Sequence, residues 1–184
     1  MVDKKNEIEI KTILKLHEAA EKLDYNALTT LINENSFNKD HLSIPLKKLY
    51  EKEIDENKEI VNFIKILIEK GCDINEEYDG KNLLMHACYK GWFEVVKYVC
   101  NYDEKILAVT NKKNNNCLYY AVISNKVNID LIDYLLKKNV KSNLKCNCKK
   151  DTCLNIAVKL GNMSVAMLLL QYGADPNILT EEKM

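Results

Sequence analysis

A pattern of two short helices recurs along the chain at a nearly constant interval, which constrains the fold more than any other feature. Residues 82–100 and 152–170 share an opening Asn or Thr, an apolar segment, a loop Gly and a second apolar segment. Residues 116–136 form a looser copy. Apolar residues such as Leu84, Ala87 and Cys88 fall at helical spacing. Self-similarity at a period of about 20–50 residues is typical of repeat proteins.

Two series of positions extend this period towards the N-terminus. The residues that end each second helix are Gly, Asn or Asp, which tolerate the left-handed conformation at a helix C-terminus. They are 36, 32, 36 and 34 residues apart. These helix-ending residues are Asn35, Gly71, Asp103, Asn139 and Gly173. The second series consists of the leucines that open each first helix, which are Leu16, Leu46, Leu84, Leu118 and Leu154.

Neither short helix of a repeat could bury its apolar face alone. Stacking adjacent repeats would bury these faces in one continuous core. The spacing therefore predicts an all-α fold, a solenoid of paired antiparallel helices. Far-ultraviolet circular dichroism should show helix and almost no regular strand.

Local motifs then give a family resemblance. The segment from Gly173 to Asn177 reads Gly-Ala-Asp-Pro-Asn, and the segment from Leu16 to Ala20 reads Leu-His-Glu-Ala-Ala. These motifs resemble the closing and opening motifs of the ankyrin-repeat family, whose repeat is about 33 residues. The resemblance implies one domain, 1–184, with projecting finger loops. Its expected repeats are 12–40, 41–77, 78–109, 110–145 and 146–178, followed by a polar tail at 179–184.

Some positions depart from the family pattern. Pro45 is the only Pro at the Pro position of a repeat opening, and Lys150 lies where the family prefers Gly. Repeat two carries extra residues within 51–61. Added loop length costs little free energy, so the fold prediction stands.

The resemblance implies a non-catalytic protein-interaction module that binds a partner through its finger loops and first helices. Tyrosine often anchors such interfaces. Trp92 is either an exposed anchor or a residue packed between neighbouring repeats. The expected finger residues are Tyr78, Asp79, Lys81, Lys112, Lys113, Asn115, Lys149 and Lys150, and the expected outward residues of the helices are His86, Tyr89, Lys90, Tyr120, Ser124 and Lys159.

Charge narrows the class of partner. Residues 1–80 contain 12 Lys and 18 acidic residues, a balance of −6, and residues 81–184 contain 15 Lys and 9 acidic residues, a balance of +6. The chain has no Arg, so the bidentate guanidinium contacts common in nucleic-acid recognition are missing. We expect an acidic protein segment as partner, bound by lysines of repeats four and five, and we expect neither nucleic acid nor membrane.

The seven cysteines leave one alternative open. In a reducing cytosol we expect mostly free thiols. The segment Cys146-x-Cys148-x4-Cys153 could instead hold zinc with Cys117 as a fourth ligand, which would make the chain a metal- or redox-responsive regulator. This spacing matches known zinc patterns poorly, so we expect neither metal nor other cofactor.

No arrangement in the sequence indicates an enzyme. His86 has no nucleophile at a suitable spacing, His41 falls in a polar linker between predicted helices, and no glycine-rich phosphate motif is present. The charged N-terminus has no apolar segment behind it, which predicts a cytoplasmic protein without a signal peptide. We expect a monomer. A viral or bacterial effector that binds a host protein by the same surface, in host cytoplasm or nucleus, is the other alternative.

Overall fold

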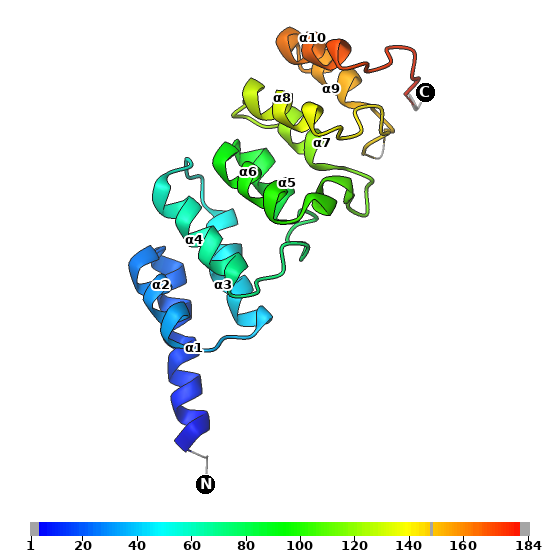
Figure 1. Ribbon diagram of the computed structural model, residues 1–184. Coiled ribbons are helices and arrows are strands. Elements are labelled where there is room, and N and C mark those ends of the chain that lie inside the picture. The colour runs from blue at the N-terminus through cyan, green and yellow to red at the C-terminus, as the bar shows by residue number, and fades with distance from the viewer. Residues whose placement is uncertain (1–3, 148, 181–184) are drawn as a thin grey trace. The chain divides into compact units, whose positions relative to one another are not determined.

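The chain folds into paired helices. The computed structural model describes residues 4–147 and 149–180, with side chains from residue 8 onward (Figure 1). Within these residues no strand is present, so the all-α prediction is confirmed. The elements are α1 Lys4–Lys22, α2 Tyr25–Glu34, α3 Lys39–Glu51, α4 Lys58–Glu69, α5 Leu83–Lys90, α6 Phe93–Tyr102, the 3₁₀ helix η1 Glu104–Ala108, α7 Cys117–Val122, α8 Ile129–Lys137, α9 Cys153–Lys159 and α10 Met163–Gln171.

The helices form two compact units, Met1–Ile74 and Asn75–Met184. In the first unit, α1 packs against α2 and α3, and α2 packs against α4. The predicted repeat-opening residues Leu16 and Leu46 are buried in this unit. The first unit therefore contains repeats one and two.

The second unit contains repeats three to five, each a helical hairpin. The pairs are α5 with α6, α7 with α8, and α9 with α10, and the first helices α5, α7 and α9 stack in that order. Ala87 and Ala157 are fully buried where helices meet. This arrangement positions the loops that precede α5, α7 and α9 next to one another along the unit (Figure 1).

The predicted left-handed stop occurs in three repeats. Gly71, Asn139 and Gly173 have φ of 92°, 59° and 78°. The prediction is wrong at Asn35 and Asp103, whose backbones are extended. At Asp103 the reason is local, because its side chain accepts a hydrogen bond from the Lys105 amide at 3.0 Å and so starts η1.

The first helices of repeats one and two begin earlier than predicted. Asn38 caps α3 by accepting a hydrogen bond from the amide of His41 at 2.9 Å, so the helix starts at Lys39. Pro45 consequently lies inside α3 and not at its first turn. The same cap places His41 in the first turn of α3, so its assignment to a polar linker is wrong.

Candidate functional site

Each finger loop of the second unit is a tight turn closed by backbone hydrogen bonds. We define finger three as residues 77–81, finger four as 111–115 and finger five as the described residues of 145–151, which exclude Cys148. In finger three, Tyr78 and Lys81 exchange two backbone hydrogen bonds of 2.9 and 3.1 Å. Asp79 and Gly80 between them have φ of 51° and 67°. This is the geometry that an Asp-Gly pair adopts in a two-residue hairpin turn.

Fingers four and five are also closed by backbone hydrogen bonds, across longer turns. The backbone amide of Asn111 donates to the backbone carbonyl of Asn115 at 3.0 Å, and Asn114 has φ of 58°. The Cys146 amide donates to the Asp151 carbonyl at 2.7 Å. Lys150 adopts φ of 53°, so the Gly-preferring position does take the left-handed conformation.

Asparagine side chains connect the three fingers. Asn111 Nδ2 donates to the Gly80 carbonyl at 2.6 Å and to the Tyr120 hydroxyl at 2.9 Å. The backbone amide of Asn147 donates to Asn115 Oδ1 at 2.7 Å. Both Asn111 and Asn115 are buried. The fingers are thus held to one another by partly buried hydrogen bonds and form a preorganised surface.

A hollow of about 570 Å³ lies between fingers three and four. It brings together several residues that the sequence had singled out, and it adds others such as Tyr119 and Ile123 that the sequence reasoning missed. Its lining residues are Glu77, Asp79, Gly80, Lys81, Asn111, Lys112, Lys113, Asn115, Tyr119, Tyr120, Ile123 and Asn147.

Lys81 is one of the residues that line this hollow. Its Nζ lies 2.7 Å from Asp79 Oδ2, 5.8 Å from the Tyr89 ring centre and 5.7 Å from the Tyr120 ring centre. Its side chain is only 14% exposed. The hydrogen bond from Lys81, with its charge, lowers the pKa of Asp79. The charge of Lys81 is therefore paired with Asp79 beside two tyrosine rings.

Exposed charges lie both on the lining of the hollow and on finger five beyond it. Lys112 and Lys113 of finger four, and Lys149 and Lys150 of finger five, are exposed as predicted. Lys159 is also exposed, and its Nζ lies 2.7 Å from Asp151 Oδ1. Finger three contributes the opposite sign, because Glu77 and Asp79 line the hollow and are exposed.

The expectation that the remaining helix and finger residues face outward is wrong for a buried subset. His86 Nε2 lies 2.9 Å from the Tyr78 carbonyl oxygen, and Ser124 Oγ donates to the Tyr89 carbonyl at 2.7 Å. These side chains connect backbone segments and do not face solvent. The residues of this buried subset are His86, Lys90, Asn115, Tyr120 and Ser124.

Of the two interpretations of Trp92, the structure supports a packed residue and not an exposed anchor. It is 0% exposed and precedes α6 directly, with its amide donating to the Ala87 carbonyl at 2.9 Å. Tyr78 and Tyr89, by contrast, are half-buried, and only part of each ring is accessible. Burial of the indole is consistent with packing inside the second unit.

Three of the four cysteines considered as alternative zinc ligands, Cys117, Cys146 and Cys153, are buried. Cys146 and Cys153 are fully buried and in hydrogen-bonding contact, which raises the pKa of Cys153 and lowers that of Cys146. Cys117 contacts Cys88, whose pKa is raised by burial. Cys148 lies outside the described residues. Among residues 4–147 and 149–180, no three His, Cys, Asp or Glu side chains converge as a metal site would need.

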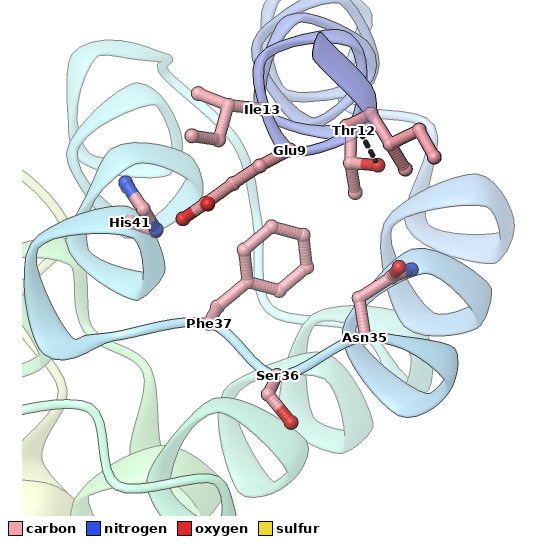
Figure 2. Close-up of a pocket in the computed structure, with 8 residues that line it drawn as sticks. Glu9, Thr12, Ile13, Asn35, Ser36, Phe37 and His41 are labelled. Carbon is pink, nitrogen blue, oxygen red and sulfur yellow. Dashed lines mark hydrogen bonds between the residues drawn. The ribbon is translucent and has the colours of Figure 1, made fainter. Parts of the chain in front are cut away.

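The first unit has a separate, smaller hollow of about 220 Å³ beside α1 (Figure 2). Phe37 and His41 meet edge to face at 5.9 Å between ring centres. The Glu9 carboxylate points towards His41, and Ile13 lies on the same side of α1 (Figure 2). None of the residues predicted for binding lines this hollow, so fingers three to five remain the candidate site.

Comparison with known proteins gives the family of the repeats. A family model described as ankyrin repeats in three copies matches residues 16–108, 49–145 and 104–180. That family is generally non-catalytic. Within the described part of the chain, no helix has both the length and the apolar character to cross a membrane.

Individual relatives share parts of the chain. An I-Kappa-B like protein N3 of Microplitis demolitor bracovirus is 31% identical over 103 residues, covering 52% of this chain and 63% of the relative. The human palmitoyltransferase ZDHHC13 is 30% identical over 133 residues, 69% of this chain and 19% of the relative. The regulatory protein SWI6 of Kluyveromyces lactis is 68% identical over 28 residues, 15% of this chain and 4% of the relative. The chain therefore spans less than two thirds of each of these relatives.

Proposed function

The chain belongs to the ankyrin-repeat family, and from this membership we propose that it binds a partner protein through fingers three to five and catalyses no reaction. Ankyrin repeats are protein-interaction modules. The similarity to the palmitoyltransferases runs through their ankyrin domains, so it supports no transfer activity here.

One observation carries the proposal: hydrogen bonds connect the three fingers in the unbound chain. Asn111 bonds finger four to Gly80 of finger three, and Asn115 bonds it to Asn147 of finger five. Asn114 Nδ2 adds a further bond to the Lys145 carbonyl at 2.8 Å. A surface already held in its binding conformation loses less conformational entropy when a ligand binds. This property suits recognition of an extended protein segment.

The charge of the exposed side chains favours an acidic segment. Lys112 and Lys113 are exposed, and the sequence has no acidic residue between Glu104 and Asp130. Lys149 and Lys150 extend the same sign onto finger five. Such a strip accelerates association with an acidic partner, and salt screens it. Tyr119 and Ile123 in the hollow offer apolar contact area behind the strip.

Selection from a random peptide library displayed on phage tests this proposal, because it does not require the partner to be identified. We expect peptides selected on the intact chain to be enriched in Asp and Glu. The double variant Lys112→Glu, Lys113→Glu should bind them at least about tenfold more weakly, because two attractions become repulsions. The matched control is Lys105→Glu, Lys137→Glu, which changes two exposed lysines outside the hollow and should bind like the parent.

Two outcomes would contradict the proposal. Selected peptides without acidic enrichment would remove the electrostatic argument. Equal weakening by the finger variant and by the control variant would show that net charge alone governs binding, with no contribution from the hollow.

A host-directed viral or bacterial effector is a second candidate, supported by the similarity to the bracovirus protein over about half of the chain. It would use the same finger surface, within host cytoplasm or nucleus. The source of the partner distinguishes the candidates. Affinity capture from host extract and from extract of the source organism, compared with the Lys112→Glu, Lys113→Glu variant in each, should give a variant-sensitive partner in only one extract.

A further inference from the structure

The exposed charges of the second unit change sign from one finger to the next. Finger three presents two exposed carboxylates, those of Glu77 and Asp79. Among the described residues of fingers four and five the one acid is Asp151, which is 3% exposed and whose Oδ1 lies 2.7 Å from Lys159 Nζ. The exposed charges of these two fingers are therefore all positive. They are Lys112, Lys113, Lys145, Lys149 and Lys150.

The carboxylates of finger three remain accessible to a ligand. Glu77 is exposed and has no ion-pair partner within the part of the chain that the structure describes. Asp79 pairs with Lys81 through Oδ2, yet its side chain is 80% exposed. The hydrogen bond from Lys81 lowers the pKa of Asp79, and the charge of Lys113 on finger four contributes to the same shift. The negative and the positive parts of the hollow are therefore close enough for one ligand to meet both.

A partner that is acidic along its whole length would match only part of this surface. Over fingers four and five its carboxylates would face lysines, but over finger three they would face Glu77 and Asp79. Like charges brought together at an interface cost affinity, whereas opposite charges fix the register of a partner. Tyr119 and Ile123, both half-buried, line the same hollow and offer apolar area to the methylene stem of a Lys or Arg side chain.

The spacing of the fingers sets the spacing of the charges on the partner. The first helices α5, α7 and α9 stack in that order, and packed helices lie about 8–10 Å apart. An extended chain advances about 3.3 Å per residue, so it needs about three residues to pass from one finger to the next. We propose, on the basis of the proposed function of these fingers, that the partner segment is bipolar and places a Lys or Arg over finger three. Its acidic residues then follow about three positions away over finger four and about six positions away over finger five.

The sign of one substitution tests this proposal. Fluorescence anisotropy would measure the Kd of peptides selected on the intact chain for the parent and for Glu77→Lys. A bipolar peptide should bind Glu77→Lys at least about threefold more weakly, because an attraction becomes a repulsion. A peptide that is acidic throughout should bind this variant more tightly, because a repulsion becomes an attraction.

Charge exchange in the peptide shows whether the effect is local. Replacing the Lys or Arg of the peptide by Glu should weaken binding to the parent and restore binding to Glu77→Lys. Glu34→Lys is the matched control, since Glu34 is exposed at the end of α2, does not line the hollow, and undergoes the same change of charge. It should bind the bipolar peptide like the parent. Both substitutions are at exposed positions and should leave the circular dichroism spectrum unchanged.

The outcomes separate this inference from the proposed function. Acidic peptides that lack a basic residue at this spacing, or that bind Glu77→Lys as tightly as the parent or more tightly, would overturn the bipolar partner and leave the acidic partner standing. Equal weakening by Glu77→Lys and Glu34→Lys would also overturn it, because net charge alone would then govern binding. Selected peptides without acidic enrichment would contradict the proposed function and the bipolar partner together.

Discussion

Asparagine is the residue that does most to define the local structure of this chain. Asn38, Asn57, Asn82, Asn116, Asn128 and Asn162 each accept a hydrogen bond at the start of a helix. The Asn side chain is among the best N-caps because its oxygen accepts from an otherwise unsatisfied backbone amide. Many of the asparagines of this chain therefore stabilise helix ends, and others connect the fingers.

Two equivalent caps differ in one hydrogen bond, which makes them a matched pair. Asn82 Nδ2 is buried without a partner, whereas Asn116 Nδ2 donates to the Lys141 carbonyl at 2.9 Å. Thr retains the capping oxygen, as Thr152 shows in repeat five. We expect Asn82→Thr to raise the free energy of unfolding by about 0.5–1 kcal/mol and Asn116→Thr to lower it by about 1 kcal/mol. Urea unfolding measures both, and a stabilised Asn116→Thr variant would contradict the account.

His86 makes stability depend on pH. Burial lowers the pKa of His86 to about 4 from its usual 6.5. Above pH 6.5 the ring is neutral in both states and this penalty is absent. As the pH falls from 6.5 to 4, the unfolded chain takes up a proton that the folded chain rejects, so folding should lose about 2–3 kcal/mol.

Urea unfolding at pH 7 and pH 5 measures most of this loss, about 2 kcal/mol over that interval. His86→Gln can still donate to the Tyr78 carbonyl but does not titrate, so its unfolding free energy should fall less over the same interval. An identical pH dependence for the parent and the variant would show that other groups cause the effect.

At the scale of the element, the loop between the paired helices is more constrained in repeat three than in repeat five. Gly91 and Gly161 have left-handed φ of 75° and 70°. A Cβ on Gly91 would lie 2.9 Å from the Lys126 carbonyl oxygen, while one on Gly161 would meet nothing within 4 Å. The two positions share the backbone strain and differ only in the close approach of a neighbouring repeat.

The substitutions Gly91→Ala and Gly161→Ala separate these contributions. Both should lower the melting temperature because Ala is strained in the left-handed region. Gly91→Ala should cost about 1–2 kcal/mol more, since Lys126 must move. Equal losses in thermal unfolding would mean that repeats three and four do not approach as closely as the structure has them.

The elements themselves were largely predictable from sequence, and their bounds were less so. Helical periodicity indicated the paired helices of repeats three to five, because their apolar faces must be buried against neighbouring repeats, and the spacing of opening leucines and helix-ending residues extended the pattern to repeats one and two. It did not predict the early starts of α1 and α3, since a cap such as Asn38 begins a helix wherever the next residues permit. Pro45 fits the pattern of a repeat opening although it lies within α3.

For the whole molecule, the finger surface was only half predictable. The exposed lysines followed from charge and the expected loop positions. The sequence did not predict that Tyr120, Ser124 and Asn115 are buried. Helical spacing cannot distinguish a residue facing solvent from one bonded to a neighbouring repeat. The run of asparagines around finger four was the available signal, since buried amides need partners.

The most direct measurement of the central claim is site-specific photo-crosslinking of a selected acidic peptide to the chain. The benzophenone amino acid would replace Lys113 at the hollow or, in the matched control, Lys105 on η1; both lysines are exposed. Binding across fingers three to five predicts that the peptide crosslinks efficiently from position 113 and not from position 105. Crosslinking from position 105 alone, or equally from both positions, would show that the finger surface is not where the partner binds.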